Sequence, residues 1–329
     1  TAGHVTPNIA LLPALQAAGY EIAYVGSYEG IEKKLIADFN IPYTGISTGK
    51  FRRYLDPKNF SDPFRVMKGF VEARNYLKNY QPDVVFSKGG FVSVPVVRAA
   101  ASLHIPCIIH ESDMTPGLAN KLCIPVAEKV CCNFPETMKN IPADKAVLTG
   151  SPIRAELAQG SRLAGLNMCG FTANKPVIMV IGGSLGAANV NKAVRDALPK
   201  LLEDFQVVHL CGKDKIDNLL LNTPGYKQFE YIKAELKDIF AMADVVISRA
   251  GANAICELLA LKKPNILIPL PAASSRGDQL LNAASFEAQG YSIVLNEDDI
   301  TTNLLVDKVH ELYFNRQNYV EAMSRSHQM

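Results

Sequence analysis

The sequence carries little net charge, no long apolar run and no cysteine framework, and each absence excludes a class of protein. A formal net charge of +2 is too small for a general attraction to nucleic acid, so no nucleic-acid partner is expected. Charged residues interrupt every apolar run before the ~20 residues that a spanning helix needs, so any membrane contact should be peripheral. Seven cysteines without a C-x-x-C pair or zinc spacing, and no visible signal peptide, favour a reducing, cytosolic setting.

Several catalytic motifs are also missing. No D-x-D occurs, which argues against a metal ion that clamps a diphosphate, so neither a metal nor another cofactor is expected. Neither G-x-S-x-G nor a Ser-His-Asp order is present, which argues against a serine hydrolase. The glycine-rich stretch Gly182–Ala187 follows an apolar run, but it lacks the lysine of a phosphate-binding P-loop.

Strand-like and helix-length segments alternate along the chain. Apolar runs such as Val84–Ser87, Pro106–His110 and Pro176–Ile181 are separated by stretches of helical length. This alternation predicts an α/β protein with parallel sheets and right-handed crossovers, and the length predicts two domains. The break at Thr149–Pro152 predicts a junction, with domains over 1–151 and 152–315 and a C-terminal helix over 316–329 that returns to the first domain.

The first residues predict a loop over Thr1–His4, followed by a helix over 8–18 that Pro7 introduces. A βα unit needs a strand before such a loop, and none precedes this one. We therefore expect that a first, buried strand is missing from this sequence. A segment over 160–175 is interpreted as a connector between the domains.

Polar side chains of the first half follow predicted strands, where ligands of parallel sheets bind. His4 is a candidate base because an ordinary histidine pKa is about 6.5, although a histidine tied to the backbone is an alternative. Glu111 and Asp113 are the other candidates for acid–base chemistry. For His110, which ends a buried strand, we favour a structural bond to a carbonyl group. Gly89 and Gly90 permit either a tight turn or close approach to a ligand.

A segment over 50–70 interleaves bases with aromatic residues, among them Phe51, Arg52, Arg53 and Phe64. Aromatic rings at headgroup level and bases on phosphates are typical of a surface that binds anionic lipid. The alternative is a long loop followed by an amphipathic helix that packs on the sheet.

The second half centres on a predicted strand over 245–247, a small-residue loop over 248–251 and a helix over 253–260. A loop of this kind at a helix N-terminus predicts an anion site, and Glu257 one turn further could bind sugar hydroxyls. An ordinary βα connection is the alternative. A polar loop over 272–278 leads to a helix that starts with Gln279. Ser184, in the other glycine-rich turn, could donate its hydroxyl to a phosphate.

Taken together, these motifs resemble one family over nearly the whole chain. They are Thr1–Asn8, Gly89–Pro95, His110–Glu111, Thr149–Arg154, Gly182–Ala187 and Ser248–Glu257. The sequence resembles the MurG family of bacterial N-acetylglucosaminyltransferases. The resemblance implies a GT-B fold of two Rossmann-like domains and an inverting transfer of N-acetylglucosamine from UDP-N-acetylglucosamine to the 4-hydroxyl of undecaprenyl-diphospho-muramoyl-pentapeptide. It also implies a location at the cytoplasmic face of the cell membrane, with an anionic inner leaflet as partner.

The resemblance also implies roles for individual residues. Apart from the resemblance, His4 is the expected base and Glu111 the second candidate, because both lie on loops at the edge where the strands end, and Gly89 and Gly90 are expected on the acceptor and membrane side. The residues expected to bind the donor are Thr1, Ala2, Gly3, Asp113, Arg154, Ser184, Ile232, Ala252, Asn253, Ala254, Glu257 and Gln279. The family often has Gln-Asn after His-Glu, where this sequence has Ser112 and Asp113. Open alternatives are a UDP-N-acetylglucosamine 2-epimerase, a diacylglycerol glycosyltransferase, and a non-catalytic protein that binds a UDP-sugar.

Overall fold

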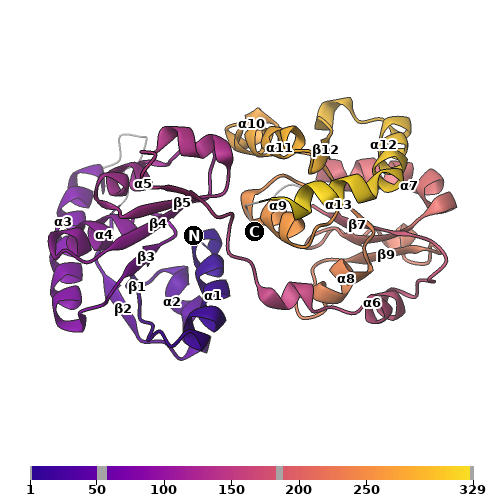
Figure 1. The fold of residues 1–329 in the computed structure, drawn as a ribbon. Helices are drawn as coiled ribbons and strands as arrows, with labels where there is room; N and C mark the ends of the chain where they lie inside the picture. The colour runs from indigo at the N-terminus through magenta and orange to yellow at the C-terminus, as the bar shows by residue number, and fades with distance from the viewer. Residues whose placement is uncertain (1, 50–57, 183–187, 327–329) are drawn as a thin grey trace. The chain divides into compact units, whose positions relative to one another are not determined.

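The computed structural model of the 329-residue chain describes residues 2–49, 58–182 and 188–326. The chain divides into two compact units, Thr1–Arg154 and Ala155–Met329. Each unit has parallel strands and covering helices, which confirms the predicted α/β class (Figure 1). The expectation that 316–329 returns to the first domain stays a prediction.

The first unit carries two parallel sheets in its described residues. β1 pairs with β2, and the other sheet has the order β3-β4-β5-β6. The strands are β1 (Tyr24–Ser27), β2 (Tyr43–Ile46), β3 (Val85–Ser87), β4 (Cys107–Glu111), β5 (Lys129–Cys132) and β6 (Ala146–Leu148). The helices are α1 (Ala2–Ala17), α2 (Ile31–Ile36), α3 (Lys58–Tyr80), α4 (Ser93–Ser102) and α5 (Leu118–Cys123).

One hydrophobic core joins these layers. It combines Ile46 of β2, Leu77 of α3, Val97 of α4 and Ile109 of β4, all of them buried. α3 and α4 pack against each other over this core. Because the strands are parallel, their carboxyl ends meet at one edge, where the loops after β3 and β4 lie side by side.

The second unit is built on a parallel sheet with the order β12-β11-β10-β7-β8-β9 in its described residues. The strands are β7 (Val177–Ile181), β8 (Gln206–Leu210), β9 (Tyr226–Phe229), β10 (Val245–Ser248), β11 (Asn265–Leu267) and β12 (Ser292–Val294). The helices are α6 (Arg162–Cys169), α7 (Ala188–Asp204), α8 (Leu236–Met242), α9 (Ala252–Ala260), α10 (Ala272–Ser275), α11 (Asp278–Ala288), α12 (Thr302–Phe314) and α13 (Arg316–Ser324).

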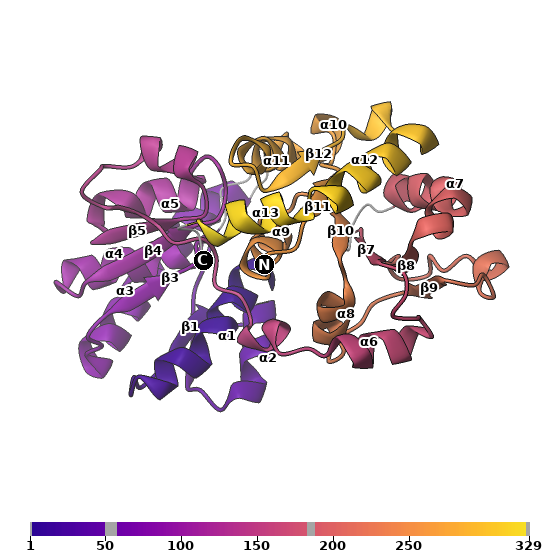
Figure 2. The same cartoon turned by 45° about the vertical axis from the view of Figure 1, so that its right-hand side comes forward.

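The strand order reverses direction between β7 and β10. From β7 the chain proceeds outward through β8 and β9, and it then returns to β10 and proceeds the other way through β11 and β12 (Figure 2). Such a reversal leaves a crevice beyond the carboxyl ends of the two central strands, and this is where open α/β sheets bind ligands. The topology therefore selects the segments after β7 and β10 as the candidate site.

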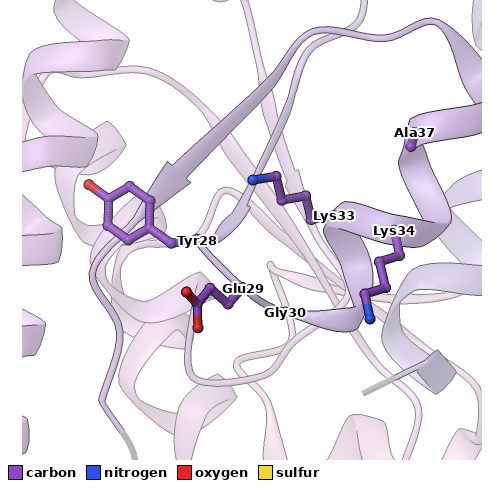
Figure 3. A pocket seen from close by; sticks show the side chains of 6 residues that line it. All are labelled: Tyr28, Glu29, Gly30, Lys33, Lys34 and Ala37. Atoms are coloured by element: carbon purple, nitrogen blue, oxygen red, sulfur yellow. The ribbon is translucent and has the colours of Figure 1, made fainter.

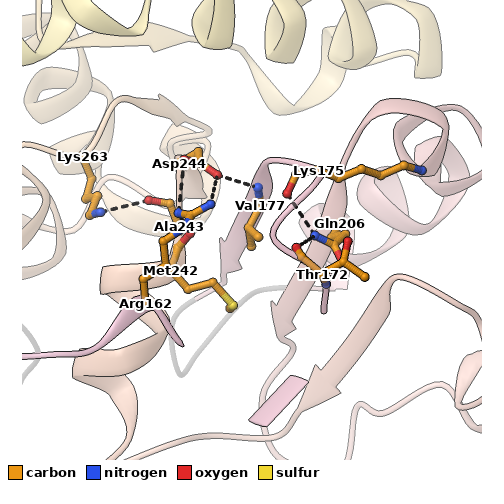
Figure 4. A network of polar contacts seen from close by, with 9 residues as sticks. All are labelled: Arg162, Thr172, Lys175, Val177, Gln206, Met242, Ala243, Asp244 and Lys263. Carbon is orange, nitrogen blue, oxygen red and sulfur yellow. Dashed lines mark hydrogen bonds and ion pairs between the residues drawn. The ribbon is translucent and has the colours of Figure 1, made fainter. Parts of the chain in front are cut away.

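At the opposite edge of this sheet, a polar network ties the amino ends of the strands together (Figure 4). Asp244 accepts a hydrogen bond from the backbone N–H of Val177 at 2.8 Å, and its carboxylate lies 3.4 Å from the guanidinium of Arg162. Lys263 donates to the carbonyl of Ala243 at 2.9 Å. These bonds hold β7, β10 and α6 together at the amino ends of the strands. We therefore assign them a role in the stability of the second unit.

Several predicted elements are wrong. The expected loop over Thr1–His4 is helical from Ala2 onward, with Pro7 inside α1. A run rich in alanine and leucine favours helix strongly enough to include both Pro7 and Pro13, each of which costs a backbone hydrogen bond and a local clash.

Two expected loops also contain helices. The connector over 160–175 contains α6, which begins after Ser161, whose Oγ accepts from the N–H of Ala164, and ends at Gly170 with φ 67°. A serine at the N-cap and a glycine at the C-cap are standard signals for the ends of a helix, and the sequence contains both. The polar loop over 272–278 contains the short helix α10 before α11 begins at Asp278.

Candidate functional site

In the second unit, the loop after β10 leads into an uncapped helix N-terminus. Gly251 is the N-cap of α9 in extended conformation, and no side chain caps the helix. The first intrahelical bond runs from the N–H of Ile255 to the carbonyl of Gly251 at 3.0 Å. The N–H groups of Ala252, Asn253 and Ala254 therefore point out of the helix with the positive end of its dipole, as an anion site requires.

Gln279 and Asn282 of α11 hold the loop that precedes α9. The Oε1 atom of Gln279 accepts from the backbone N–H groups of Ala250 at 3.2 Å and of Leu270 at 3.0 Å. Asn282 donates to the carbonyl of Ala250 at 3.0 Å. Because Oε1 of Gln279 already accepts two bonds, its amide nitrogen is the group through which it could meet a sugar hydroxyl.

The other residues predicted to bind the donor lie on several different elements and differ in burial. Glu257 is half-buried in α9, and Ile232 is half-buried between β9 and α8. Arg154 is the half-buried last residue of the first unit. Gly3 lies in α1, and Asp113 is exposed. Thr1 and Ser184 lie outside the described residues, as does the side-chain environment of Ala2.

In the first unit, His4 lies on α1 and not in a loop. Its side chain is half-buried, and a methyl group added to Gly90 would lie 3.3 Å from its Nδ1 atom. Burial lowers the pKa of His4 below its usual value, and the positive charge of Lys88 lowers it further. A neutral imidazole at physiological pH is the protonation state that a general base needs.

Glu111 occupies a different environment. Glu111 is 4% exposed, and its carboxylate accepts from the N–H groups of Asp113 at 2.9 Å and Gly117 at 3.2 Å and from the side chain of Asn120 at 2.8 Å. Burial raises its pKa, and these hydrogen bonds oppose the rise. The contacts favour a role in ordering the loop after β4, while the predicted role as a base stays a prediction.

His110 donates from Nε2 to the carbonyl of Gly150 at 2.7 Å, which confirms the structural bond expected for it. Sequence reasoning missed its other partner. The buried Lys88 lies with Nζ 2.8 Å from Nδ1 of His110. The available signal was a lysine placed between a buried strand and two glycines, Gly89 and Gly90, whose φ angles are 105° and 89°.

The predicted lipid-binding segment is described in part. Phe51, Arg52 and Arg53 lie outside the described residues. Phe64 is 78% exposed on α3, and Met67 and Val71 are exposed on the same helix. Spacings of three and four residues place these apolar side chains on one face. Among the described helices, none is long and apolar enough to cross a bilayer.

A separate hollow lies at the beginning of α2 (Figure 3). It is open to solvent, and the two lysines that line it, Lys33 and Lys34, are exposed. Its rim residue Tyr28 donates its hydroxyl to Glu72 at 2.6 Å. None of the predicted site residues lines it, so the pocket does not contribute to the candidate site.

Family models match both units. The glycosyltransferase family 28 N-terminal domain matches residues 1–132, and the corresponding C-terminal domain matches residues 177–329. The solved structure of MurG from Acinetobacter baumannii is similar with a TM-score of 0.76 at 28% identity, covering 99% of this chain and 91% of that one.

Curated relatives are similar over the full chain. The UDP-N-acetylglucosamine--N-acetylmuramyl-(pentapeptide) pyrophosphoryl-undecaprenol N-acetylglucosamine transferase of Lachnospira eligens is 64% identical over 328 residues, which span 100% of this chain and 93% of that protein. The transferase of the same name from Clostridium botulinum is 57% identical, over 99% of this chain and 92% of that protein. The chain therefore belongs to glycosyltransferase family 28 and, within it, to the MurG family of GT-B glycosyltransferases.

Proposed function

We propose that the protein transfers N-acetylglucosamine from UDP-N-acetylglucosamine to the 4-hydroxyl of a lipid-linked muramoyl-pentapeptide, with inversion at the anomeric carbon. Family membership at 64% identity carries this proposal, because the matching relative is named for this donor and this acceptor. In the proposed reaction, a base takes the proton of the acceptor hydroxyl, the oxygen attacks the anomeric carbon, and UDP leaves.

The second unit offers the donor site. The N-terminus of α9 and the segment after β7 flank the reversal in strand order, where a diphosphate would meet backbone N–H groups. Glu257 lies in the second turn of α9, at a depth suited to ribose hydroxyls. Each preorganised donor to the leaving oxyanion can contribute about 2.7–4 kcal/mol to catalysis. We propose that these amides, with Ser184, bind the diphosphate without an essential metal ion.

The first unit offers the acceptor side. His4 is the proposed base, since its lowered pKa keeps the imidazole neutral and its ring lies against the Gly90 backbone. Gly89 and Gly90 have left-handed backbone conformations, and without side chains their backbone permits close approach of a ligand. We propose that the exposed apolar face of α3 meets the cytoplasmic leaflet of the cell membrane, with neighbouring bases on anionic headgroups.

The decisive experiment is a radiolabelled sugar-transfer assay with a lipid-linked muramoyl-peptide acceptor, with and without EDTA. We expect transfer that requires the acceptor, releases one UDP per sugar and survives EDTA. Release of UDP without acceptor, or appearance of free N-acetylmannosamine, would indicate a 2-epimerase instead. Transfer to diacylglycerol would indicate a lipid glycosyltransferase. Binding of UDP-N-acetylglucosamine without turnover would leave only a binding protein.

A further inference from the structure

Lys88 is buried at the carboxyl edge of the sheet in the first unit. It follows β3 directly, and its side chain is 3% exposed. Its Nζ atom lies 2.8 Å from Nδ1 of His110 and 2.7 Å from Oγ of Ser112. Burial of an ammonium group costs several kcal/mol before its hydrogen bonds compensate. Methionine would fill a similar volume without that cost, so packing alone does not account for a lysine at this position.

The chemistry of the partners assigns the protons of His110. An ammonium group has only donors, so Nδ1 of His110 must accept from Lys88. The carbonyl of Gly150 only accepts, so Nε2 must carry the proton. Burial, reinforced by the charge of Lys88, lowers the pKa of His110 to about 3. His110 is therefore a neutral, fixed link between the segment after β3 and the segment after β6.

Ser112 extends this link to the loop after β4. Its short side chain accepts from Nζ of Lys88 at 2.7 Å. The same loop is ordered by Glu111 through the N–H groups of Asp113 and Gly117. One ammonium group thus joins the loops after β3 and β4.

His4 lies against the part of the loop that Lys88 anchors. Gly90 is two residues beyond Lys88, and a methyl group at Gly90 would lie 3.3 Å from Nδ1 of His4. Ser93, at the beginning of α4, accepts from Ser87 at 2.6 Å and donates to the carbonyl of Gly89 at 2.8 Å, so the loop is held from both sides. The surface that supports the His4 ring is therefore set by the anchors of this loop.

We propose that Lys88 is a positioning residue for the glycosyl transfer, one that locks the loops after β3 and β4 to each other and presents the glycine surface against which His4 works. This inference rests on the proposed function. Lys88 acts through the backbone of Gly89 and Gly90 and through its fixed charge, and the proposal gives it no contact with either substrate.

The fixed charge provides a readout that a purely structural role lacks. Besides burial, the charge of Lys88 lowers the pKa of His4. Loss of the Lys88 charge should raise the pKa of His4, so the acidic limb of the pH–rate profile should move to higher pH.

The test compares Lys88→Met with Lys263→Met in the intact enzyme. Lys263, in the second unit, also has its pKa lowered by burial and donates to a backbone carbonyl, that of Ala243. We expect Lys88→Met to lower kcat at least tenfold at pH 7, to leave the KM for the donor within twofold, and to move the acidic limb of kcat/KM upward. Lys263→Met should leave the pH profile in place. An unchanged kcat and profile for Lys88→Met would overturn the proposal, as would an equal loss at every pH.

A second measurement separates this proposal from the proposed function. The chain has 6 histidines, so nitrogen-15 labelling of histidine gives a spectrum simple enough to follow His110. In the wild type, we expect a neutral Nε2–H tautomer that persists well below pH 5. In Lys88→Met, His110 should titrate at higher pH or exchange between tautomers. If the wild type transfers no sugar, the proposed function fails. An unchanged His110 spectrum in Lys88→Met would overturn the positioning role of Lys88, whatever the activity.

Discussion

Arg249 and Glu297 form a buried ion pair with a nitrogen–oxygen distance of 2.6 Å. Arg249 follows β10 directly, at the start of the loop that leads to α9, and it also donates to the carbonyls of Ile268 and Pro269 after β11. Arg249 therefore ties the loop before α9 to the segment after β11 through these carbonyls and to the segment after β12 through Glu297. Loss of the ion pair should therefore both destabilise the second unit and disturb the loop of the proposed donor site.

Replacement of Arg249 by methionine should destabilise the second unit. Loss of one partner leaves the Glu297 carboxylate buried without its ion pair, which typically costs about 3–5 kcal/mol. Urea unfolding of Arg249→Met should show this loss, together with weaker UDP binding by calorimetry. Lys192→Met removes the exposed Lys192–Asp196 pair and serves as the control, with an effect below about 1 kcal/mol. Equal stability of the two variants would contradict the assignment.

Replacement of His4 by alanine should lower kcat by about 10²–10⁴, the usual contribution of general-base catalysis. UDP affinity and thermal stability should change little, since the half-buried ring lies against Gly90. Glu111→Gln should act differently, because it places an amide opposite three N–H donors. We expect a lower melting temperature for Glu111→Gln. Near-full turnover by His4→Ala would eliminate His4 as the base.

Acid should destabilise the fold through two buried histidines. Burial lowers the pKa of both His110 and His209 to about 3. An unfolded histidine titrates near 6.5, so between these values the unfolded chain binds a proton that the native state excludes. The contribution is complete above pH 6.5 and decreases by about 1.4 kcal/mol per pH unit for each histidine as pH falls.

Urea unfolding between pH 6.5 and 4.5 measures this slope. In His209→Gln, the free energy of unfolding should be lower at pH 6.5, because the bonds to Tyr226 and Asn191 change. Its decline with falling pH should nevertheless be shallower than in the wild type. A parallel decline in both proteins would show that His209 does not remain neutral in the native state.

Polar substitution on α3 should weaken membrane binding. Phe64→Ser with Met67→Ser removes the two most exposed apolar side chains among the residues of this helix whose burial the structure describes. We expect loss of co-sedimentation with anionic vesicles and full retention of UDP binding. Leu219→Ser, at a 93% exposed position in the second unit, is the matched control. Charge reversal of Arg52 and Arg53 should reduce vesicle binding at low salt. If neither the Phe64 and Met67 variant nor the charge-reversal variant changes co-sedimentation, α3 does not form the membrane-binding face.

Local signals in the sequence were sufficient for the fold class and for the strand, turn and helix over residues 245–260. Buried runs such as Val177–Ile181 predicted parallel strands, and the small residues before α9 predicted an uncapped helix start. They also predicted that His110 bonds a carbonyl. These features depend on neighbours within a few residues, so a single sequence contains enough information to find them.

Long-range relationships were decided only by the tertiary structure. Lys88 meets His110 across 22 positions, and Arg249 meets Glu297 across 48, so no local pattern reveals either pair. The chain as a string of residues determined which segments are strands, helices and small-residue turns, because hydrophobic period and backbone preference are local properties. Packing of parallel strands decided which polar side chains are buried together, because the order of strands in the sheet brings distant segments to one edge.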